Sequence, residues 1–257
     1  MKRIRLIGEY DGTDYVGWQI QPNGVSVQEM IKAALCDLTG EDIVLHGSGR
    51  TDSGVHARAQ VMHFDTSSRI PAEKFPYALN VKLPADIRIL YGDEPGDDFH
   101  ARYDVRRKHY RYTVYNAPHA SAFCRNTALH VHHELDVNAM QRAAAAVCGE
   151  HDFSAFKAQG TDLKSTVRTI YRSEWTQDGK FLYYDICGSG FMYNMVRILV
   201  GTMIEIGKGY VHESIVSEAL QSGKRDDAGA TAPAHGLCMM RVEYDDFDTQ
   251  TALMPKK

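Results

Sequence analysis

A single carboxylate lies inside a glycine-punctuated stretch whose residue types suit chemistry. Residues 47–57 read Gly-Ser-Gly-Arg-Thr-Asp-Ser-Gly-Val-His-Ala, with Asp52 near their centre and apolar runs on both sides. The glycines permit positive φ angles and close approach of another molecule. Arg50, two residues before the acid, offers a charge partner or a phosphate contact. The pattern predicts a reactive carboxylate at Asp52; the alternative is a surface turn in which Asp and Ser cap local amides.

A second informative charge is Arg197, the one formally charged residue between Asp185 and Glu205. Its neighbours predict a helix that is apolar on nearly all sides, and such a helix is buried. A buried guanidinium is costly without an anion. We therefore expect Arg197 to pair with Asp52 across a cleft between two halves of the protein, which would keep a nucleophilic acid ionised. Alternatively, Arg197 reaches the surface along its aliphatic stem.

One segment combines cations with aromatic residues. Five cations (Arg102, Arg106, Arg107, Lys108 and Arg111) stand against one acid, Asp104, and alternate with Tyr103, Tyr110 and Tyr112. Aromatic rings can stack on bases while neighbouring cations hold the RNA backbone. A solvated strand edge would have the same composition. Because the whole chain has a formal net charge of -4, any affinity for RNA must come from such a local concentration of positive charge.

The composition limits the other possibilities. A chain of 257 residues with 44% hydrophobic content forms one large or two smaller domains. It contains no apolar run of about 20 residues and its first residues alternate like a strand, so we expect a cytoplasmic protein with no membrane partner. The five cysteines form no Cys-x-x-Cys pair, and the cluster His130, His132 and His133 lacks a further ligand, so no metal site is predicted.

The apolar periodicity predicts an α+β protein made of two mixed units in tandem, with antiparallel sheets covered by helices on one face. Strands are expected at 3–10, 43–46, 60–64, 87–91, 108–115, 167–175, 181–187 and 237–244, and helices at 27–39, 73–80, 136–148, 192–206 and 213–221. A capping box, Ser26 to Glu29, and Gly40 delimit the first helix. The expected division is 1–98 and 99–248, followed by a disordered tail at 249–257. Asp52 would lie on a loop between strands, where reactive groups are often mounted.

Seven blocks of the chain, in order, resemble the tRNA pseudouridine synthase A family. They are Tyr10 to Thr13 with Gly17 to Gln21, Gly49 to Ala57, Phe99 to Arg102, Tyr110 to Tyr112, His151 to Phe156, Met195 to Arg197 with Gly201, and Ala232 to Leu237. The departures are small: Ser53 stands where alanine is more usual, and Ala230 where proline often precedes the Thr-Ala-Pro segment. Neither departure touches the expected nucleophile.

The resemblance implies a pseudouridine synthase core of two ferredoxin-like halves, whose sheets meet at a central cleft, in a homodimer that cradles tRNA. It implies isomerisation of uridine to pseudouridine on the 3′ side of the anticodon stem-loop. By motif position, Asp52 is the nucleophile, Tyr110 stacks on or contacts the target uracil, and Arg197 is the ion-pair partner of Asp52. Arg50 contacts RNA or helps to displace the target nucleotide.

This chemistry suits the residue types. The target uridine must leave the stack, which requires an aromatic platform and a cation. A carboxylate then assists cleavage of the C1′–N1 bond by attacking the sugar, attacking the ring or abstracting a sugar proton, and the sequence leaves these three routes open. The isomerisation transfers no electrons and cleaves no phosphate, so no cofactor is expected.

Two other functions are consistent with parts of the sequence. Asp-Ser-Gly is also the local signature of aspartic proteases, but those need a second such triplet and an apolar lead-in, and here the lead-in is Gly-Arg-Thr. A non-catalytic tRNA-binding protein, acting as an RNA chaperone, could keep the same fold. The presence of Asp52, Tyr110 and Arg197 together favours the enzyme, because a pure binder has no evident use for a buried carboxylate in an anion-binding cleft.

Overall fold

The computed structural model describes residues 1–158 and 165–254, which fold into two compact units. Unit 1 comprises residues 1–107 and the segment from 239 onwards, and unit 2 comprises residues 108–238. These units differ from the expected halves 1–98 and 99–248, because the last strand returns to the first unit. No helix among the described residues is long and apolar enough to cross a bilayer.

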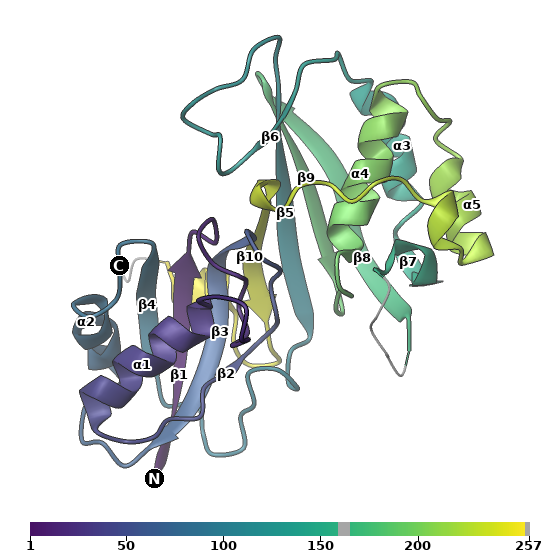
Figure 1. Cartoon of the computed structure of the whole chain (residues 1–257). Coiled ribbons are helices and arrows are strands. Elements are labelled where there is room, and N and C mark those ends of the chain that lie inside the picture. The colour runs from purple at the N-terminus through teal and green to yellow at the C-terminus, as the bar shows by residue number, and fades with distance from the viewer. Residues whose placement is uncertain (159–164, 255–257) are drawn as a thin grey trace. The chain divides into compact units, whose positions relative to one another are not determined.

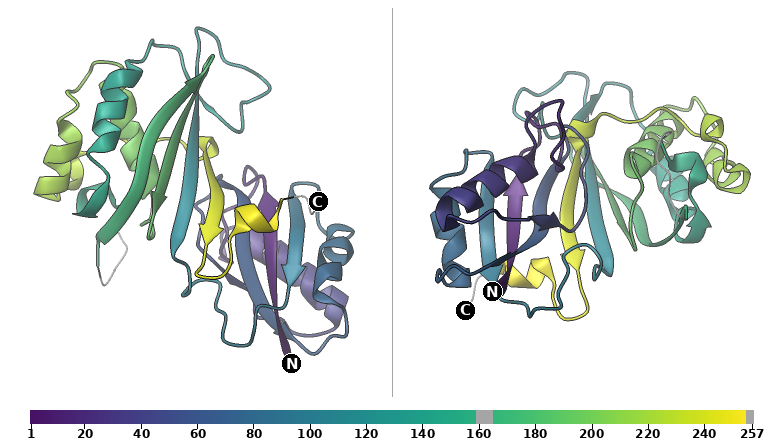
Figure 2. Two further views of the ribbon diagram at one scale, coloured as in Figure 1. Left: turned by 180° about the vertical axis from the view of Figure 1, so that it is seen from behind. Right: turned by 60° about the horizontal axis from the view of Figure 1, so that its bottom comes forward.

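In unit 1, antiparallel strands are covered on one face by two helices. Its elements are β1 (Lys2–Tyr10), α1 (Val27–Thr39), β2 (His46–Gly47), β3 (His56–Thr66), η1 (Ala72–Lys74), α2 (Phe75–Asn80), β4 (Ile87–Asp93), the end of β10 (Leu237–Glu243) and α6 (Thr249–Ala252). The strands lie in the order β4-β1-β3-β10, and β2 pairs with β3. Helices α1 and α2 lie against the same face of this sheet (Figures 1 and 2).

Unit 2 contains further strands and its own helices. Its elements are β5 (Arg107–Asn116), β6 (Leu129–Val131), α3 (Val137–Ala145), β7 (Gly149–Asp152), η2 (Ser154–Phe156), β8 (Val167–Asp178), β9 (Phe181–Gly188), α4 (Met195–Gly207), α5 (Ile215–Ser222), η3 (Arg225–Asp227) and η4 (Ala234–Gly236). Strands β5, β9, β8 and β7 follow one another in the sheet, and β6 runs parallel beside β5. Figure 1 shows α3 and α4 side by side in this unit.

Local sequence signals placed most of the elements. The capping box of α1 forms as predicted: the Ser26 side chain accepts from Glu29 N and the Glu29 carboxylate accepts from Ser26 N. Gly40 ends the helix at φ 71°. The strand expected at 43–46 is wrong, because only residue 46 pairs; Ile43 and Leu45 are buried without joining the sheet, which explains their alternation.

Three of the predicted helices have different limits. The helix expected at 73–80 splits into η1 and α2, which places Pro76 in the first turn of α2, where a missing N–H breaks no hydrogen bond. The helix expected from residue 192 begins at Met195, because Asn194 adopts φ 61°. The helix expected at 136–148 ends at Ala145, and Asp136 caps its start by accepting from Ala139 N at 2.9 Å.

The tail expected to be disordered from residue 249 is ordered up to 254. Thr249 is fully buried and accepts a hydrogen bond from Val242 N at 3.1 Å. Asp248 caps α6 and also accepts from Arg241 Nε at 2.8 Å. These contacts attach the segment to β10; residues 255–257 lie outside the described residues.

Three histidines cluster at the β2–β3 end of unit 1. The His46 ring stacks on the His63 ring at 4.8 Å, and the His100 ring lies 4.7 Å from that of His63. Ala101 N donates to His63 Nδ1 at 3.1 Å. Burial, together with positive charge on His100 and His46, lowers the pKa of His63 to about 4 from its ordinary 6.5. The folded protein therefore keeps His63 neutral.

We predict that this histidine makes folding pH-dependent. The unfolded chain takes up a proton at His63 below pH 6.5 and the folded chain does not, so the stabilisation is complete above pH 6.5 and is lost as the pH falls towards 4. Between pH 7 and pH 5 this amounts to about 2 kcal/mol of unfolding free energy. His63→Asn, whose side-chain oxygen can still accept from Ala101 N, should lose that part of the decrease in urea titrations. An unchanged pH dependence would contradict the assignment.

Candidate active site around Asp52

Asp52 is half-buried on the loop 48–55 that joins β2 to β3. The entry to this loop is held by β3. Ser48 N donates to Val61 O at 2.7 Å. The buried Gln60 side chain accepts from Ser48 Oγ at 2.6 Å and donates to Gly49 O at 2.8 Å. The backbone that leads to Arg50 is therefore fixed before the acid is reached.

The segment 10–18 holds the loop on both sides of Asp52. Just before the acid, the hydroxyls of Thr51 and Tyr10 share a buried hydrogen bond of 2.7 Å, and Trp18 N donates to Thr51 O at 3.1 Å. Just after it, Ser53 Oγ and Gly54 N donate to Tyr15 O at 3.2 and 3.3 Å. Asp52 is thus confined by contacts on either side, including one from Ser53.

This attachment requires a glycine at position 17. Gly17 has φ +106°, and a Cβ there would lie 2.6 Å from Thr51 O. Only Gly thus permits the backbone of this segment to approach the loop so closely without strain. Within the stretch 47–54, by contrast, the positive φ expected of the glycines occurs only at Gly54.

Sequence reasoning missed the residues that fix the loop, namely Tyr10, Tyr15 and Thr51. Tyr10 and Thr51 fall in separate motif blocks and are 41 residues apart, so only the folded chain shows that their hydroxyls meet. The available signal was the glycine-rich composition of residues 11–17, which predicted a loop but not its partner.

Arg50 is exposed, and the described residues offer its side chain neither a hydrogen bond nor an ion pair. It therefore does not serve as a structural partner within the loop. Its guanidinium is available for a ligand, which agrees with the expected phosphate contact and does not test it.

Arg197 is half-buried in α4 of unit 2. Its Nε donates to Ala232 O at 2.7 Å, its Nη1 donates to Asn194 Oδ1 at 2.8 Å, and its own carbonyl accepts from Ala232 N at 3.0 Å. Gly201 lets the segment before Ala232 cross α4 closely, because a Cβ there would lie 1.8 Å from Ala230 O. These contacts orient the guanidinium; its pairing with Asp52 stays a prediction.

The three residues of the block Tyr110 to Tyr112 make different contacts. Tyr110 is 7% exposed, and its ring meets that of Phe191 edge-on at 5.2 Å. Tyr112 is fully buried and donates to Pro233 O at 2.8 Å, which anchors the block from Ala232. Arg111 binds Asp185 through two hydrogen bonds of 2.9 Å.

The basic segment is less available to RNA than its composition predicted. Burial alone would raise the pKa of Asp185, but hydrogen bonds from His109 and Arg111 hold it at about 2, so this carboxylate is ionised and neutralises Arg111. Arg106 likewise pairs with Asp245 at 2.6 Å. At least two of the five cations are thus engaged with carboxylates.

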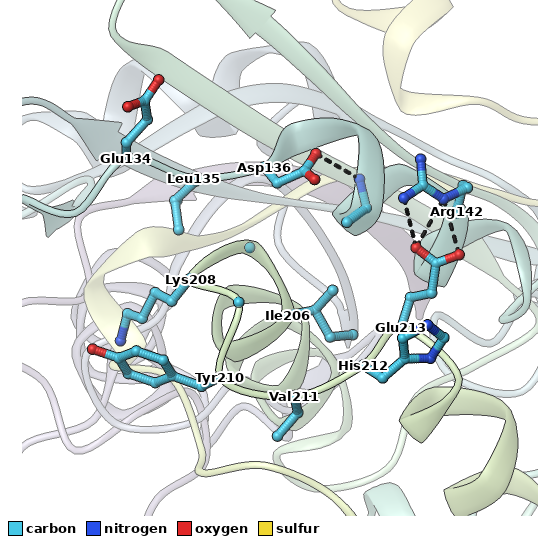
Figure 3. Close-up of a pocket in the computed structure, with 13 residues that line it drawn as sticks. Glu134, Leu135, Asp136, Arg142, Ile206, Lys208, Tyr210, Val211, His212 and Glu213 are labelled. Atoms are coloured by element: carbon cyan, nitrogen blue, oxygen red, sulfur yellow. Dashed lines mark hydrogen bonds and ion pairs between the residues drawn. The ribbon is translucent and has the colours of Figure 1, made fainter.

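No group of His, Cys, Asp and Glu within the described ranges is placed to hold a metal ion. A pocket of about 870 Å³ lies in unit 2 around the end of α4 and contains none of the predicted site residues. Figure 3 shows that its charges are of both signs and that Arg142 faces Glu213, with which it pairs at 2.7 Å. Lys208 pairs with Glu205 at 2.9 Å. These cations are already satisfied by the protein.

Comparison with known proteins places these residues in a family. A family model described as tRNA pseudouridine synthase matches residues 6–104 and 143–245. The chain is 50% identical over 245 residues to "tRNA pseudouridine synthase A" of Ruminiclostridium cellulolyticum, and 48% identical over 244 residues to the protein of that name from Acetivibrio thermocellus. Each alignment covers 95% of this chain and 100% of the relative.

Among solved structures, the chain shows a slight likeness to one titled "Crystal Structure of a Cbf5-Nop10-Gar1 Complex", at 12% identity and a TM-score of 0.36, covering 96% of this chain and 60% of the other. The sequence matches carry the conclusion. The residues matched by the family model include the loop that bears Asp52. The chain belongs to the tRNA pseudouridine synthase family.

Proposed function

We propose that this protein is a tRNA pseudouridine synthase that isomerises uridine on the 3′ side of the anticodon stem-loop, with Asp52 as the nucleophile. The observation that carries the proposal is a half-buried carboxylate on a loop held on both sides, in a chain that belongs to this family. A carboxylate fixed in this way needs little rearrangement before it reacts, which lowers the free-energy cost of reaching the transition state.

The other residues act around the displaced uridine. Tyr110 contacts the target uracil, with its ring oriented by the edge of Phe191. Arg197 pairs with Asp52 and keeps it ionised. Arg50 contacts the RNA or helps to displace the target nucleotide, and its lack of an ion pair with any described residue supports a role towards a ligand.

The reaction is an isomerisation of the substrate. Asp52 assists cleavage of the C1′–N1 bond, by attack on the sugar, attack on the ring or abstraction of a sugar proton. The released uracil rotates within the site, a C1′–C5 bond forms, and the proton on C5 is lost. Atoms and electrons balance within the uridine, so the protein needs to supply positioning, charge stabilisation and proton transfer only.

We propose further that each half is ferredoxin-like and that the protein is a cytoplasmic homodimer that cradles tRNA. The order β1-α1-β2-β3-α2-β4 in unit 1 supports the first part, since it is the β-α-β-β-α-β order of that motif. A monomer in light scattering at micromolar concentration would contradict the dimer.

Replacing the carboxylate tests the nucleophile. Asp52→Asn should bind an anticodon stem-loop transcript with unchanged Kd and form no pseudouridine at single-nucleotide resolution, a loss of at least about 10⁴-fold. Asp178→Asn, which alters an exposed carboxylate at the end of β8, should react like the wild type. If wild type and Asp52→Asn both bind and neither reacts on a broad tRNA set, the protein is an RNA binder instead.

Replacing Arg197 tests the ion pair. Arg197→Ala should lower the single-turnover rate about 100-fold, and it should move the acidic limb of the pH–rate profile to higher pH, because loss of the cation raises the pKa of Asp52. Arg197→Lys should retain part of the rate and of the profile. A slower enzyme with an unmoved profile would mean that Arg197 has a structural role only.

A further inference from the structure

A second pocket, of about 410 Å³, lies in unit 1 and adjoins the Asp52 loop on the Arg50 side. It is lined by Trp18, Gln19, Gln28, Leu45, His46, Gly47, Gly49, Arg50, His100, Arg102 and Tyr103. The lining holds two arginines and two histidines and no acid, although acids outnumber Lys and Arg by 33 to 29 in the whole chain. The pocket therefore concentrates positive charge on a net acidic protein.

The arginines in this pocket are not used by the fold. Arg50 and Arg102 are exposed, and within the described part of the chain neither guanidinium has a carboxylate partner. The larger pocket of Figure 3 differs, because Arg142 and Lys208 there are paired with glutamates. Unpaired guanidinium groups that line a common hollow are suited to bind a phosphate group.

An aromatic ring lies beside these cations. Tyr103 is 75% exposed, and its ring is 4.3 Å from that of His100. His100 Nδ1 accepts from Arg102 N and Tyr103 N at 3.1 and 3.3 Å, which fixes the backbone that presents both side chains. The Arg102 guanidinium lies 5.9 Å from the Tyr103 ring centre. An exposed ring held next to a cation is a platform for a nucleobase.

We propose that this pocket binds one nucleotide of the RNA strand next to the target uridine, with its phosphate on Arg50 and Arg102 and its base stacked on Tyr103. The inference rests on the proposed function, because Arg50 is two residues from Asp52 and the pocket therefore adjoins the loop that would act on the uridine. The volume falls in the range of small-ligand sites, about 300–1,000 Å³. The phosphate contact contributes affinity and the stacked base fixes the register of the strand.

The test measures RNA binding and the rate of the chemical step separately. With an anticodon stem-loop transcript, Arg102→Ala should weaken Kd about tenfold and reduce the slope of log Kd against log salt by about 1. Tyr103→Ala should weaken Kd about 5- to 100-fold, while Tyr103→Phe, which keeps the ring, should stay near wild type. In both alanine variants the loss should fall more on Kd than on the single-turnover rate at saturating RNA, because Asp52 is untouched.

A fluorescent base locates the contact. When 2-aminopurine replaces a neighbour of the target uridine, wild type and Tyr103→Phe should quench its fluorescence and Tyr103→Ala should not. Arg69→Ala removes another exposed arginine, which lies outside the pocket, and should leave Kd and quenching unchanged. The exposure of Arg102 and Tyr103 favours normal folding of the variants, and circular dichroism checks it.

The outcomes are distinguishable. If wild type modifies the RNA but Arg102→Ala and Tyr103→Ala bind as tightly as wild type, the subsite is wrong and the proposed function stands. If Arg69→Ala weakens binding as much as Arg102→Ala, only net charge matters and the subsite is again wrong. If wild type binds and quenches but never modifies RNA, the proposed function fails while the nucleotide site is confirmed.

Discussion

The site depends on a set of hydrogen bonds that attach the Asp52 loop to the segment 10–18. Thr51 is held by Tyr10 and Trp18 on one side of the acid, and Tyr15 O accepts from the two residues that follow it. Each neutral hydrogen bond is worth only about 1 kcal/mol. Their importance lies in geometry, since a loop between two strands is otherwise the most mobile part of such a unit.

The surrounding elements follow from this attachment. The segment 10–18 continues β1 at one end and, beyond the capping box of Ser26, leads into α1 at the other, so the loop is tied to both layers of unit 1. The same close-approach principle recurs in unit 2, where Gly201 brings the segment 228–232 against α4 and Ala232 O orients Arg197. In both places a glycine allows the close backbone approach that positions a side chain of the proposed site.

Local sequence signals predicted most of the elements well. Contacts between residues far apart in the sequence could not be predicted. The limits of α1 followed from Ser26, Glu29 and Gly40, because capping acts within a few residues. Tyr10, which bonds Thr51, and Ala232, which accepts from Arg197, lie 41 and 35 residues away from their partners, and no periodicity encodes these contacts. Helix α6 is only four residues long and its burial depends on β10, so no local pattern predicts it.

The most direct measurement is a double-mutant cycle on the hydroxyl pair beside the acid, with Tyr10→Phe, Thr51→Val and both together. If this contact positions Asp52, each single variant lowers the single-turnover rate of pseudouridine formation about tenfold at saturating tRNA, with Kd unchanged, and the double variant is no slower than the singles. Wild-type rates in both single variants, or losses that simply add, would contradict the account.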